Sequence, residues 1–318
     1  MTELGLPSRF RADGLPDAVT ICEVGPRDGL QNEKATVPAA VKVEFVQRLA
    51  GAGLGLVETT SFVRPEWVPQ LADAEEVVRG LAPLAGTGLR MPVLVPNLRG
   101  LARAVDLGVQ EIAIFGSATE TFAQRNLNRS MAESLAMFAP VVSQALEAGL
   151  RVRAYLSMCF GDPWEGEVPV RQVVDAGRAL LDMGCHELSL GDTIGVGTPG
   201  HVEALVASYA AAGVPVERLA VHFHDTYGQA LSNTLAALRC GVTTVDASAG
   251  GLGGCPYARS ATGNLATEDL VWMLDGLGVH TGVDLDALVR TSVWMAGRLG
   301  RPSPSRVVTA LSGATSGD

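Results

Sequence analysis

Two histidines close together at the end of an apolar run could bind a metal. His222 and His224 stand two residues apart, where the run 219–223 ends. Side chains alternate between the two faces of a β-strand, so both imidazoles would point to the same region. Two imidazoles aimed at one region suit a divalent metal ion. A solvent-facing pair beside a turn would have the same spacing, so the rest of the chain must decide.

Oxygen donors that could complete such a site lie elsewhere in the chain. Asp28 follows the first apolar run, and Asn264 follows a glycine-rich segment near residue 250. Nitrogen and oxygen ligands without a thiolate suit Mn²⁺ or Mg²⁺, with open positions for a chelating substrate. Imidazole ligands leave zinc open as well. We therefore predict that the metal ligands are Asp28, His222, His224 and Asn264.

Arg27 and Cys255 are candidates for the chemistry beside that metal. Arg27 is permanently charged and adjoins Asp28, so it could stabilise an enolate oxygen. A structural salt bridge to Glu58 or Asp192 is an equally good interpretation. Cys255 lies in the loop GGLGGCPY, which could close on a substrate, and its thiol could move a proton. A lone loop cysteine can also be incidental.

Three carboxylates could orient Arg27 or the metal ligands. Glu58 lies within an apolar run, Asp192 ends another, and Glu268 follows Asn264 by four residues. Carboxylates beside a metal site often hold its ligands in place. Surface or helix-capping roles are the alternative, and they suit Glu58 least because of its apolar neighbours.

Short apolar runs alternate with longer segments of helical character along the chain. Between 38 and 50, for example, Val41, Phe45, Val46 and Leu49 form one apolar helix face. Pro38 suits the first turn of that helix and Gly51 its end. Eight runs are predicted strands, at 19–24, 55–60, 91–95, 111–115, 151–157, 187–190, 219–223 and 244–247.

Eight strand–helix units in about 250 residues predict an α/β fold, a (β/α)8 TIM barrel. We expect an N-terminal extension over 1–18, the barrel over 19–282, and a C-terminal helical extension with a frayed tail over 283–318. A doubly wound sheet is the alternative, but Gly25-Pro26-Arg27-Asp28-Gly29 is no GxGxxG turn. In a barrel, the polar residues named above lie at or after the carboxyl ends of five different strands and would meet at one site.

Bulk properties favour a reducing compartment and a small-molecule partner. The 318 residues carry a net charge of −10 without a Lys/Arg run, which argues against nucleic acid and anionic membranes as partners. Five scattered cysteines form no CxxC pair, so a disulfide framework is not expected. The first 18 residues lack an apolar signal core and contain acidic residues, and no apolar run would span a bilayer. We expect a cytoplasmic protein.

Five motifs resemble those of the 3-hydroxy-3-methylglutaryl-CoA (HMG-CoA) lyase family. They are GPRDGLQNE from Gly25, ETTSFV from Glu58, GDTIG from Gly191, HFHDTYG from His222, and GLGGCPY from Gly251 with GNLATED from Gly263. The likeness runs in order from about residue 19 to 282. It implies a (β/α)8 barrel that uses Mg²⁺ or Mn²⁺ to cleave HMG-CoA to acetyl-CoA and acetoacetate, as in leucine degradation.

The resemblance also implies roles for single residues. Asp28, His222, His224 and Asn264 match the metal ligands, Arg27 the enolate-stabilising cation, and Cys255 the loop acid/base. Glu58, Asp192 and Glu268 match supporting carboxylates. An acyl-CoA substrate and a homodimer are implied as partners.

One segment departs from the family pattern. Asp162 and Trp164 replace a usual cysteine and tyrosine after the fifth predicted strand. A lyase for a related 3-hydroxy-3-methyl acyl-CoA is therefore an alternative. A Claisen-type synthase of the same superfamily and a metal-binding barrel without activity are others.

Breaking a carbon–carbon bond next to a carbinol requires an acidified hydroxyl and a stabilised enolate, which the predicted metal and Arg27 would supply.

Overall fold

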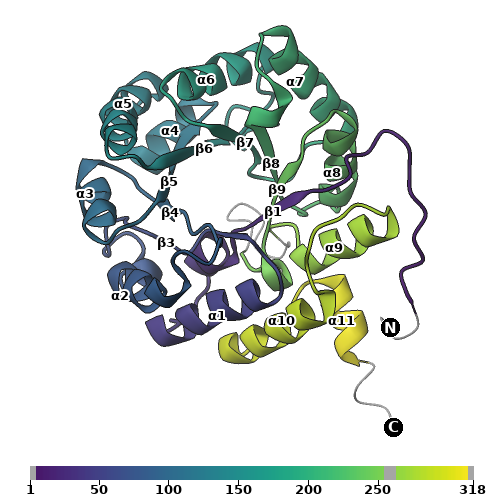
Figure 1. The fold of residues 1–318 in the computed structure, drawn as a ribbon. Helices are drawn as coiled ribbons and strands as arrows, with labels where there is room; N and C mark the ends of the chain where they lie inside the picture. Colours follow the sequence, from purple (N-terminus) through teal and green to yellow (C-terminus); the bar gives the residue numbers. More distant parts are fainter. Residues whose placement is uncertain (1–4, 254–262, 314–318) are drawn as a thin grey trace.

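The computed structural model describes residues 5–253 and 263–313. Its strands form one parallel sheet in the order β2-β1-β9-β8-β7-β6-β5-β4-β3. Figure 1 shows this sheet curved into a ring with the helices outside it, which confirms the predicted barrel. The strands are β1 Thr20–Glu23, β2 Leu56–Val57, β3 Thr60–Ser61, β4 Val93–Leu94, β5 Glu111–Ser117, β6 Arg151–Ser157, β7 Glu187–Asp192, β8 Leu219–Phe223 and β9 Thr244–Ala247.

The second predicted strand, 55–60, appears as two short pieces. β2 pairs with β1, whereas β3 pairs with β4 on the other side. Backbone hydrogen bonds bridge the interval between them, from Glu58 N to Glu23 O and from Thr59 N to Pro92 O. The chain between β2 and β3 therefore joins the two ends of the sheet and closes the ring. We call this closure, residues 56–61, the seam.

Helices follow the strands as the sequence predicts. Pro38 precedes α1 as its N-cap, one position before the predicted first turn, and α1 ends at Gly51 as expected. Phe45, Val46 and Leu49 of its predicted apolar face are buried. The helices are α1 Ala39–Gly51, α2 Ala74–Gly80, α3 Leu98–Asp106, α4 Glu120–Leu127, α5 Met131–Glu147, α6 Val170–Asp182, α7 Pro199–Ala211, α8 Ala230–Arg239, α9 Thr267–Gly276, α10 Leu285–Leu299 and α11 Arg306–Ser312.

Short helical turns complete the connections. A π-helical turn, η2 (Gly25–Gly29), follows β1 directly, and a 3₁₀ turn, η6 (Ala249–Gly251), follows β9. Both therefore lie at the carboxyl ends of neighbouring strands, where a barrel carries its chemistry. Further 3₁₀ turns are η3 Pro69–Leu71, η4 Ala82–Leu84 and η5 Val216–Arg218.

The inside of the barrel holds charged side chains. Arg153 of β6 is fully buried, and its Nε donates to Glu187 Oε2 of β7 at 2.6 Å. Its Nη2 donates to Asp246 Oδ1 of β9, also at 2.6 Å. A buried guanidinium is tolerable when carboxylates satisfy its donors, and an unpaired one would be strongly destabilising. This network joins three strands beneath the end of the barrel where η2 and η6 lie.

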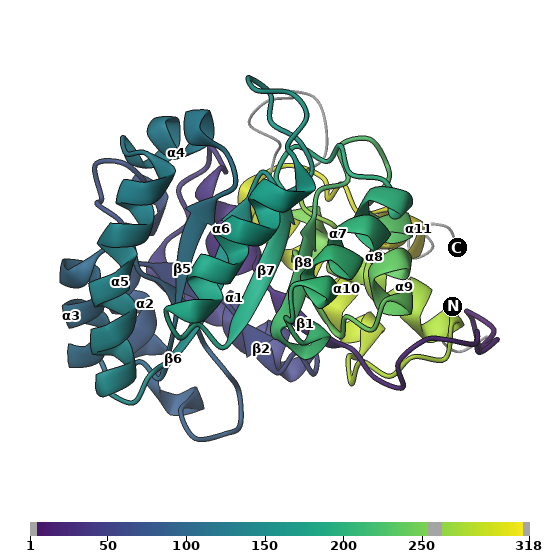
Figure 2. The ribbon, with the colours of Figure 1, turned by 90° about the horizontal axis from the view of Figure 1, so that it is seen from above.

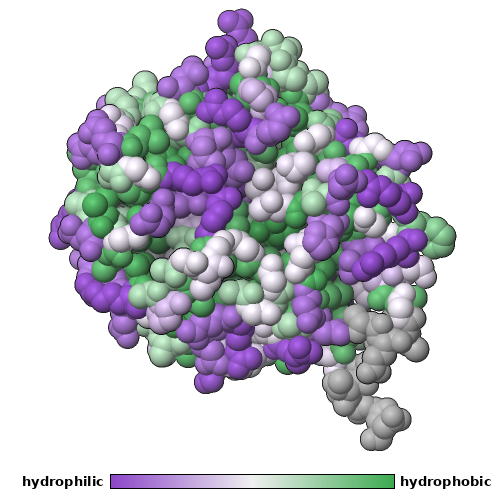
Figure 3. Space-filling model, viewed as in Figure 1, coloured by the Kyte–Doolittle hydropathy of each residue, from purple (hydrophilic) through white to green (hydrophobic). Residues whose placement is uncertain are grey.

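The apolar core lies between the sheet and the helices. Ile112 and Ile114 of β5 pack there with Val141 and Val142 of α5, and all four are fully buried. Figure 2 shows the ring of strands enclosed by helices on both sides. On the face shown in Figure 3, hydrophilic side chains are spread among hydrophobic ones without one dominant apolar area. No helix in the described part of the chain is long and apolar enough to span a membrane.

Both extensions pack onto the barrel. Val19 N donates to His280 O and Phe10 N to Gly276 O, which holds the N-terminal segment beside α9. After α9, α10 packs against α1, and α11 packs against α9 and α10. Residues 314–318, most of the tail predicted to fray, lie outside the described residues.

Candidate active site

Three predicted metal ligands come together at one end of the barrel. Asp28 lies in η2, His222 in β8, and His224 directly after β8. One ligand atom of each lies within 4.8 Å of the others. The fourth predicted ligand, Asn264, joins them, because its Nδ2 donates to Asp28 Oδ2 at 2.9 Å. The backbone at Asn264 also pairs with that at His224.

Two buried atoms of this cluster have no hydrogen-bond partner among the described residues. They are Asn264 Oδ1 and His224 Nδ1. A buried acceptor without a donor is costly and calls for an explanation such as an ion. Because Asn264 Nδ2 is engaged by Asp28 and by Leu252 O, the amide is oriented with its oxygen left over. The residues present therefore fit a divalent cation, held by imidazole nitrogens and by carboxylate and amide oxygens.

The protonation states of His224 and Asp28 suit metal ligands too. Burial, and then the charge of His222, lower the pKa of His224 to about 3, so its imidazole is neutral. Burial raises the pKa of Asp28, but the charges of Arg27 and His222 outweigh it and lower that pKa overall. A neutral imidazole and an ionised carboxylate are the forms that bind metals.

Arg27 is held between two carboxylates. Its Nε donates to Glu58 Oε2 at 2.7 Å and its Nη1 to Asp28 Oδ1 at 2.8 Å. The predicted salt bridge to Glu58 is therefore present, and no ion pair to Asp192 is formed. Arg27 also lines the cavity described below, and its Nη2 has no hydrogen bond to another described residue. The salt bridge thus orients the guanidinium and leaves one edge available to a substrate.

Asp192 and Glu268 hold loops and not ligands. The Asp192 carboxylate accepts from Val196 N and Gly197 N, each at 2.9 Å, which fixes the turn after β7. The Glu268 carboxylate accepts from Gly250 N of η6 and from Ser292 Oγ of α10. Burial raises the pKa of Asp192 to about 6 and that of Glu268 to about 8. Neither forms a hydrogen bond or ion pair with Arg27 or a predicted ligand.

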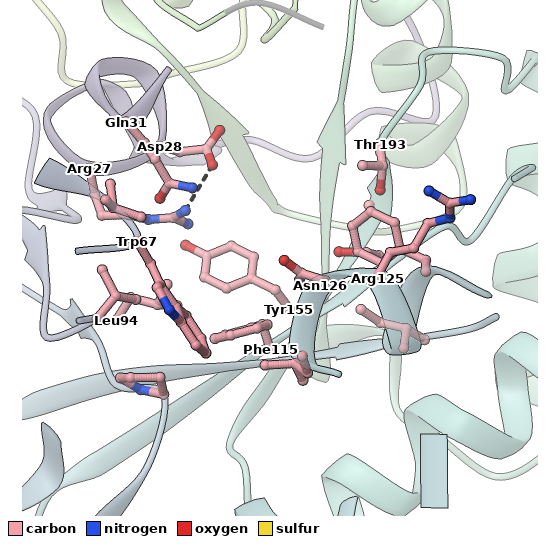
Figure 4. Close-up of a pocket in the computed structure, with 18 of the residues that line it drawn as sticks. Arg27, Asp28, Gln31, Trp67, Leu94, Phe115, Arg125, Asn126, Tyr155 and Thr193 are labelled. Atoms are coloured by element: carbon pink, nitrogen blue, oxygen red, sulfur yellow. Dashed lines mark hydrogen bonds and ion pairs between the residues drawn. The ribbon is translucent and has the colours of Figure 1, made fainter. Parts of the chain in front are cut away.

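The cluster opens into a cavity of about 780 Å³. Figure 4 shows Arg27 and Asp28 on one side of it, Arg125, Asn126 and Thr193 across from them, and Tyr155 between. Arg27, Asp28, His222 and His224 all line this cavity. A substrate in the cavity could therefore touch both a bound cation and the Arg27 guanidinium.

Comparison with known proteins shows which family the chain belongs to. The HMGL-like family model matches residues 18–294. The chain belongs to the HMGL-like family. It is 53% identical to the mitochondrial hydroxymethylglutaryl-CoA lyase of Arabidopsis thaliana over 94% of this chain, but spans only 63% of that protein. It is 48% identical to a cytoplasmic 3-hydroxy-3-methylglutaryl-CoA lyase of Rattus norvegicus, over 93% of this chain and 86% of that protein.

Solved structures of the family agree with the fold. The hydroxymethylglutaryl-CoA lyase of Pseudomonas aeruginosa superimposes with a TM-score of 0.91 at 48% identity, covering 95% of this chain and 99% of that one. An HMG-CoA lyase of Acinetobacter baumannii, in complex with coenzyme A and 3-methylmalate, gives 0.87 at 36% identity, covering 95% and 97%. The resemblance stated from the motifs is thereby confirmed.

One predicted catalytic residue of this HMGL-like chain cannot be placed. Cys255 lies in 254–262, outside the described residues. Its role as the loop acid/base therefore stays a prediction.

Sequence reasoning missed several buried residues of the site. Glu23 at the end of β1 accepts from Gly25 N and Ala249 N, each at 2.8 Å, and from Thr267 Oγ1 at 2.6 Å. It thereby ties η2, η6 and the start of α9 together. An acidic residue ending an apolar strand was the available signal. Asp246 of β9 lies 3.3 Å from His222 Nδ1, close enough to orient that ring.

Proposed function

We propose that this protein is a divalent-metal-dependent lyase that cleaves HMG-CoA to acetyl-CoA and acetoacetate. One observation carries the proposal: Asn264 and His224 each keep an unpartnered buried polar atom beside Asp28, and Asp28, His224 and Arg27 line one cavity. Family membership and relatives named as HMG-CoA lyases support the same reaction. The chain spans only 63% of the length of the Arabidopsis relative. The reaction is therefore a proposal for this chain.

The metal site we propose consists of Asp28, His222, His224 and Asn264. Mg²⁺ or Mn²⁺ is the cation that we favour, because the donors are nitrogen and oxygen without thiolate. When bound, such a cation lowers the pKa of a coordinated hydroxyl group. The protein's part is to present two imidazoles and an ionised carboxylate in one place. Glu23 and Asp246 support that arrangement from behind.

Arg27 would act on the thioester part of the substrate. Cleavage removes the proton of the 3-hydroxyl, makes C3 a ketone, and moves the C2–C3 electron pair into the enolate of acetyl-CoA. That enolate carries its charge on the thioester oxygen, where a fixed guanidinium is most effective. The enolate then takes a proton at C2, for which Cys255 remains the proposed donor. Glu58 holds Arg27 in position for this step.

A second candidate is a lyase for a related 3-hydroxy-3-methyl acyl-CoA. Asp162 and Trp164 depart from the family pattern and pack behind the cavity wall. Asp162 accepts from Thr119 Oγ1 at 2.6 Å, and the Trp164 ring lies 4.4 Å from the Arg125 guanidinium carbon. Phe122, which lines the cavity, also contacts Trp164. A different residue behind the wall is a physical reason for a different acyl preference.

The first experiment strips the protein of metal and measures acetoacetate release from HMG-CoA. We expect release with Mg²⁺ or Mn²⁺ and none without. A panel of related 3-hydroxy-3-methyl acyl-CoA esters, measured with the same protein, separates the two candidates by kcat/KM. A folded sample that cleaves none of these esters with any metal would contradict the lyase proposal.

Two further properties are also proposed. We infer that the protein forms a homodimer, as the motif resemblance implies, and sedimentation at several concentrations tests this. A cytoplasmic location is the other proposal. Relatives of the same name include both cytoplasmic and mitochondrial proteins, so localisation of the tagged full chain is the deciding measurement.

A further inference from the structure

The Tyr155 hydroxyl is a buried polar group that the reaction described above does not use. Tyr155 is 8% exposed and lines the same cavity as Arg27, Asp28 and His222. Its hydroxyl oxygen has almost no contact with solvent and no hydrogen-bond partner among the described residues. A buried hydroxyl without a partner destabilises the free protein, because its hydrogen bonds to water are lost and not replaced. A role in binding a ligand would explain why this hydroxyl has no partner in the free protein.

The position of Tyr155 on β6 points its side chain into the barrel, toward Arg27 and Asp28. Tyr155 and Arg153 stand two residues apart on β6, so both point into the barrel. Arg153 lies in the charged network, and Tyr155 lies nearer the carboxyl end of the strand, where the cavity begins. Figure 4 shows the Tyr155 hydroxyl turned toward the side of the cavity that holds Arg27 and Asp28.

Two guanidinium groups fix the ring in that position. The Cζ of Arg153 lies 4.8 Å from the centre of the Tyr155 ring, and the Cζ of Arg27 lies 5.3 Å from it. Cation–π contacts of this kind hold an aromatic ring without using its hydroxyl. The edge contact with the His222 ring, at 6.4 Å between centres, restricts it further. The phenol is therefore oriented before any substrate arrives.

We propose that the Tyr155 hydroxyl donates a hydrogen bond to the thioester oxygen of the substrate, so that Tyr155 and Arg27 together form a two-donor site for the enolate oxyanion. The inference rests on the proposed lyase function and adds a catalytic residue to it. A phenol is protonated near neutral pH, so Tyr155 has a proton to share in such a hydrogen bond.

The chemistry of the step sets which atom needs this donor. As the C2–C3 bond breaks, its electron pair enters the thioester π-system and negative charge grows on the carbonyl oxygen. Tyr155 keeps its own proton throughout and forms a hydrogen bond that strengthens as this charge develops. An interaction that is stronger in the transition state than in the ground state raises kcat and leaves KM little changed. The unpartnered hydroxyl in the free protein is then a donor held ready for that charge.

The test uses Tyr155→Phe, which removes the oxygen and keeps the ring between the two guanidiniums. Three quantities are measured on wild type and variant with Mn²⁺: kcat and KM for HMG-CoA cleavage, and deuterium uptake from D₂O into the methyl group of acetyl-CoA. The acetyl group of acetyl-CoA has a thioester oxygen but lacks the 3-hydroxyl and the carboxylate of HMG-CoA, so uptake reports on the enolate alone. We expect kcat and the uptake rate each to fall about 100-fold, the loss typical of one missing oxyanion donor.

Two structural readouts accompany these rates. We expect the Mn²⁺ dissociation constant of Tyr155→Phe to stay within twofold of wild type, and its thermal midpoint without metal to stay equal or rise. Tyr209→Phe is the matched control, because the buried Tyr209 hydroxyl of α7 donates to Val173 O at 2.9 Å. That variant should melt at a lower temperature and keep its kcat. Tyr155→Phe should thus lower the rate without lowering stability, whereas Tyr209→Phe should lower stability without lowering the rate.

Several results would overturn the proposal. Tyr155→Phe with kcat within threefold of wild type removes the catalytic role. A large loss of cleavage with unchanged deuterium uptake removes the thioester oxygen as the acceptor. A wild type that exchanges acetyl-CoA protons but does not cleave HMG-CoA contradicts the proposed function, while the uptake rates of the two proteins still decide the role of Tyr155. A wild type that does neither overturns both.

Discussion

At the scale of single residues, the charge of Arg27 is fixed by its surroundings. Burial disfavours a charged guanidinium, but Glu58 and Asp28 outweigh that effect and raise its pKa further. The Glu58 side chain is fully buried, so this pair is poorly screened by solvent. Arg27 therefore remains a cation at every pH at which the protein is folded. A fixed, dehydrated cation is what a developing enolate requires.

Arg27→Gln should lower kcat without removing the metal. The loss of transition-state stabilisation should be about 3–4 kcal/mol, the order seen when one oxyanion donor is removed. Mn²⁺ binding, measured by the free-ion signal in electron paramagnetic resonance, should persist because Arg27 is not a ligand. Arg48→Gln is the control, since Arg48 pairs with Glu44 on the exposed surface of α1. Near-full turnover by Arg27→Gln would contradict the enolate role.

His222→Ala should lose metal affinity and activity together. Removing an outer partner of a metal ligand typically weakens binding 10–100-fold, and removing a ligand itself should do at least as much. Equilibrium dialysis against Mn²⁺ measures the affinity directly. His280→Ala serves for comparison, because His280 is exposed and lies beside the start of β1. Unaltered Mn²⁺ affinity in His222→Ala would remove His222 from the ligand set.

At the scale of elements, buried carboxylates hold the loops at the end of the barrel where the proposed ligands lie. Glu23 ties η2 to η6 and to α9, and Glu268 ties η6 to α10. Asp28 lies in η2, and Asn264 lies just before α9. The proposed metal ligands are therefore positioned by hydrogen bonds from segments that are far apart in the sequence. Burial raises the pKa of Glu23 to about 7 and that of Glu268 to about 8.

These raised pKa values predict how stability depends on pH. A carboxyl group with a folded pKa of about 8 and an ordinary value of 4.5 binds more protons in the folded state between those pH values. The free energy of unfolding should therefore fall as pH rises from about 4.5 to about 8. Glu23, the charged group that faces Glu268, should add to this fall up to about pH 7.

Glu268→Gln isolates this contribution. The amide keeps an acceptor for Gly250 N and cannot ionise, so the variant should lose part of the decline in stability with pH. Urea unfolding of wild type and variant at several pH values measures the difference between their slopes. Glu33→Gln is a suitable comparison, because Glu33 pairs with Arg301 and lies outside the Glu23–Glu268 pair. Parallel curves for wild type and Glu268→Gln would contradict the raised pKa.

At the scale of the whole molecule, a metal that binds only the folded barrel should stabilise it. Ligand at 100 times its dissociation constant adds about 2.7 kcal/mol to the free energy of unfolding. For a chain of this size we expect the thermal midpoint to rise by several degrees with saturating Mn²⁺. Calorimetry of the metal-free protein with increasing Mn²⁺ measures this shift. A similar rise in Asp28→Asn would show that the stabilising ion binds elsewhere.

Much of this architecture could be predicted from the sequence. The eight predicted strands occur, because short apolar runs separated by helical segments are typical of a parallel barrel. The four predicted ligands meet because they lie at, or in loops after, the carboxyl ends of strands. The division of the chain at residues 282 and 283 stays a prediction.

The interior residues could not be predicted in the same way. Strands of a parallel barrel are buried on both faces, so their sequence does not say which face points into the barrel. In β6, polar and apolar residues alternate and put Arg153 and Tyr155 on one face, but nothing in the sequence shows that this polar face is the inner one. Asp246 lies in the short strand β9, whose sequence gives no better indication. Their roles depend on which strands face one another across the barrel, and only the folded structure shows this.

The seam has a mechanical consequence. β5 pairs with β6 along its full length, from Glu111 to Ser117, whereas β2 and β3 each pair through two residues. A ring deforms most easily where the fewest bonds resist, so this barrel is stiff along one arc and compliant at the seam. Tyr155 and His222 belong to the stiff arc, and Val63, Arg64 and Trp67 of the cavity wall follow the compliant one. Deformation of the cavity should thus concentrate in the wall that follows the seam, while Tyr155 and His222 on the stiff arc keep their spacing.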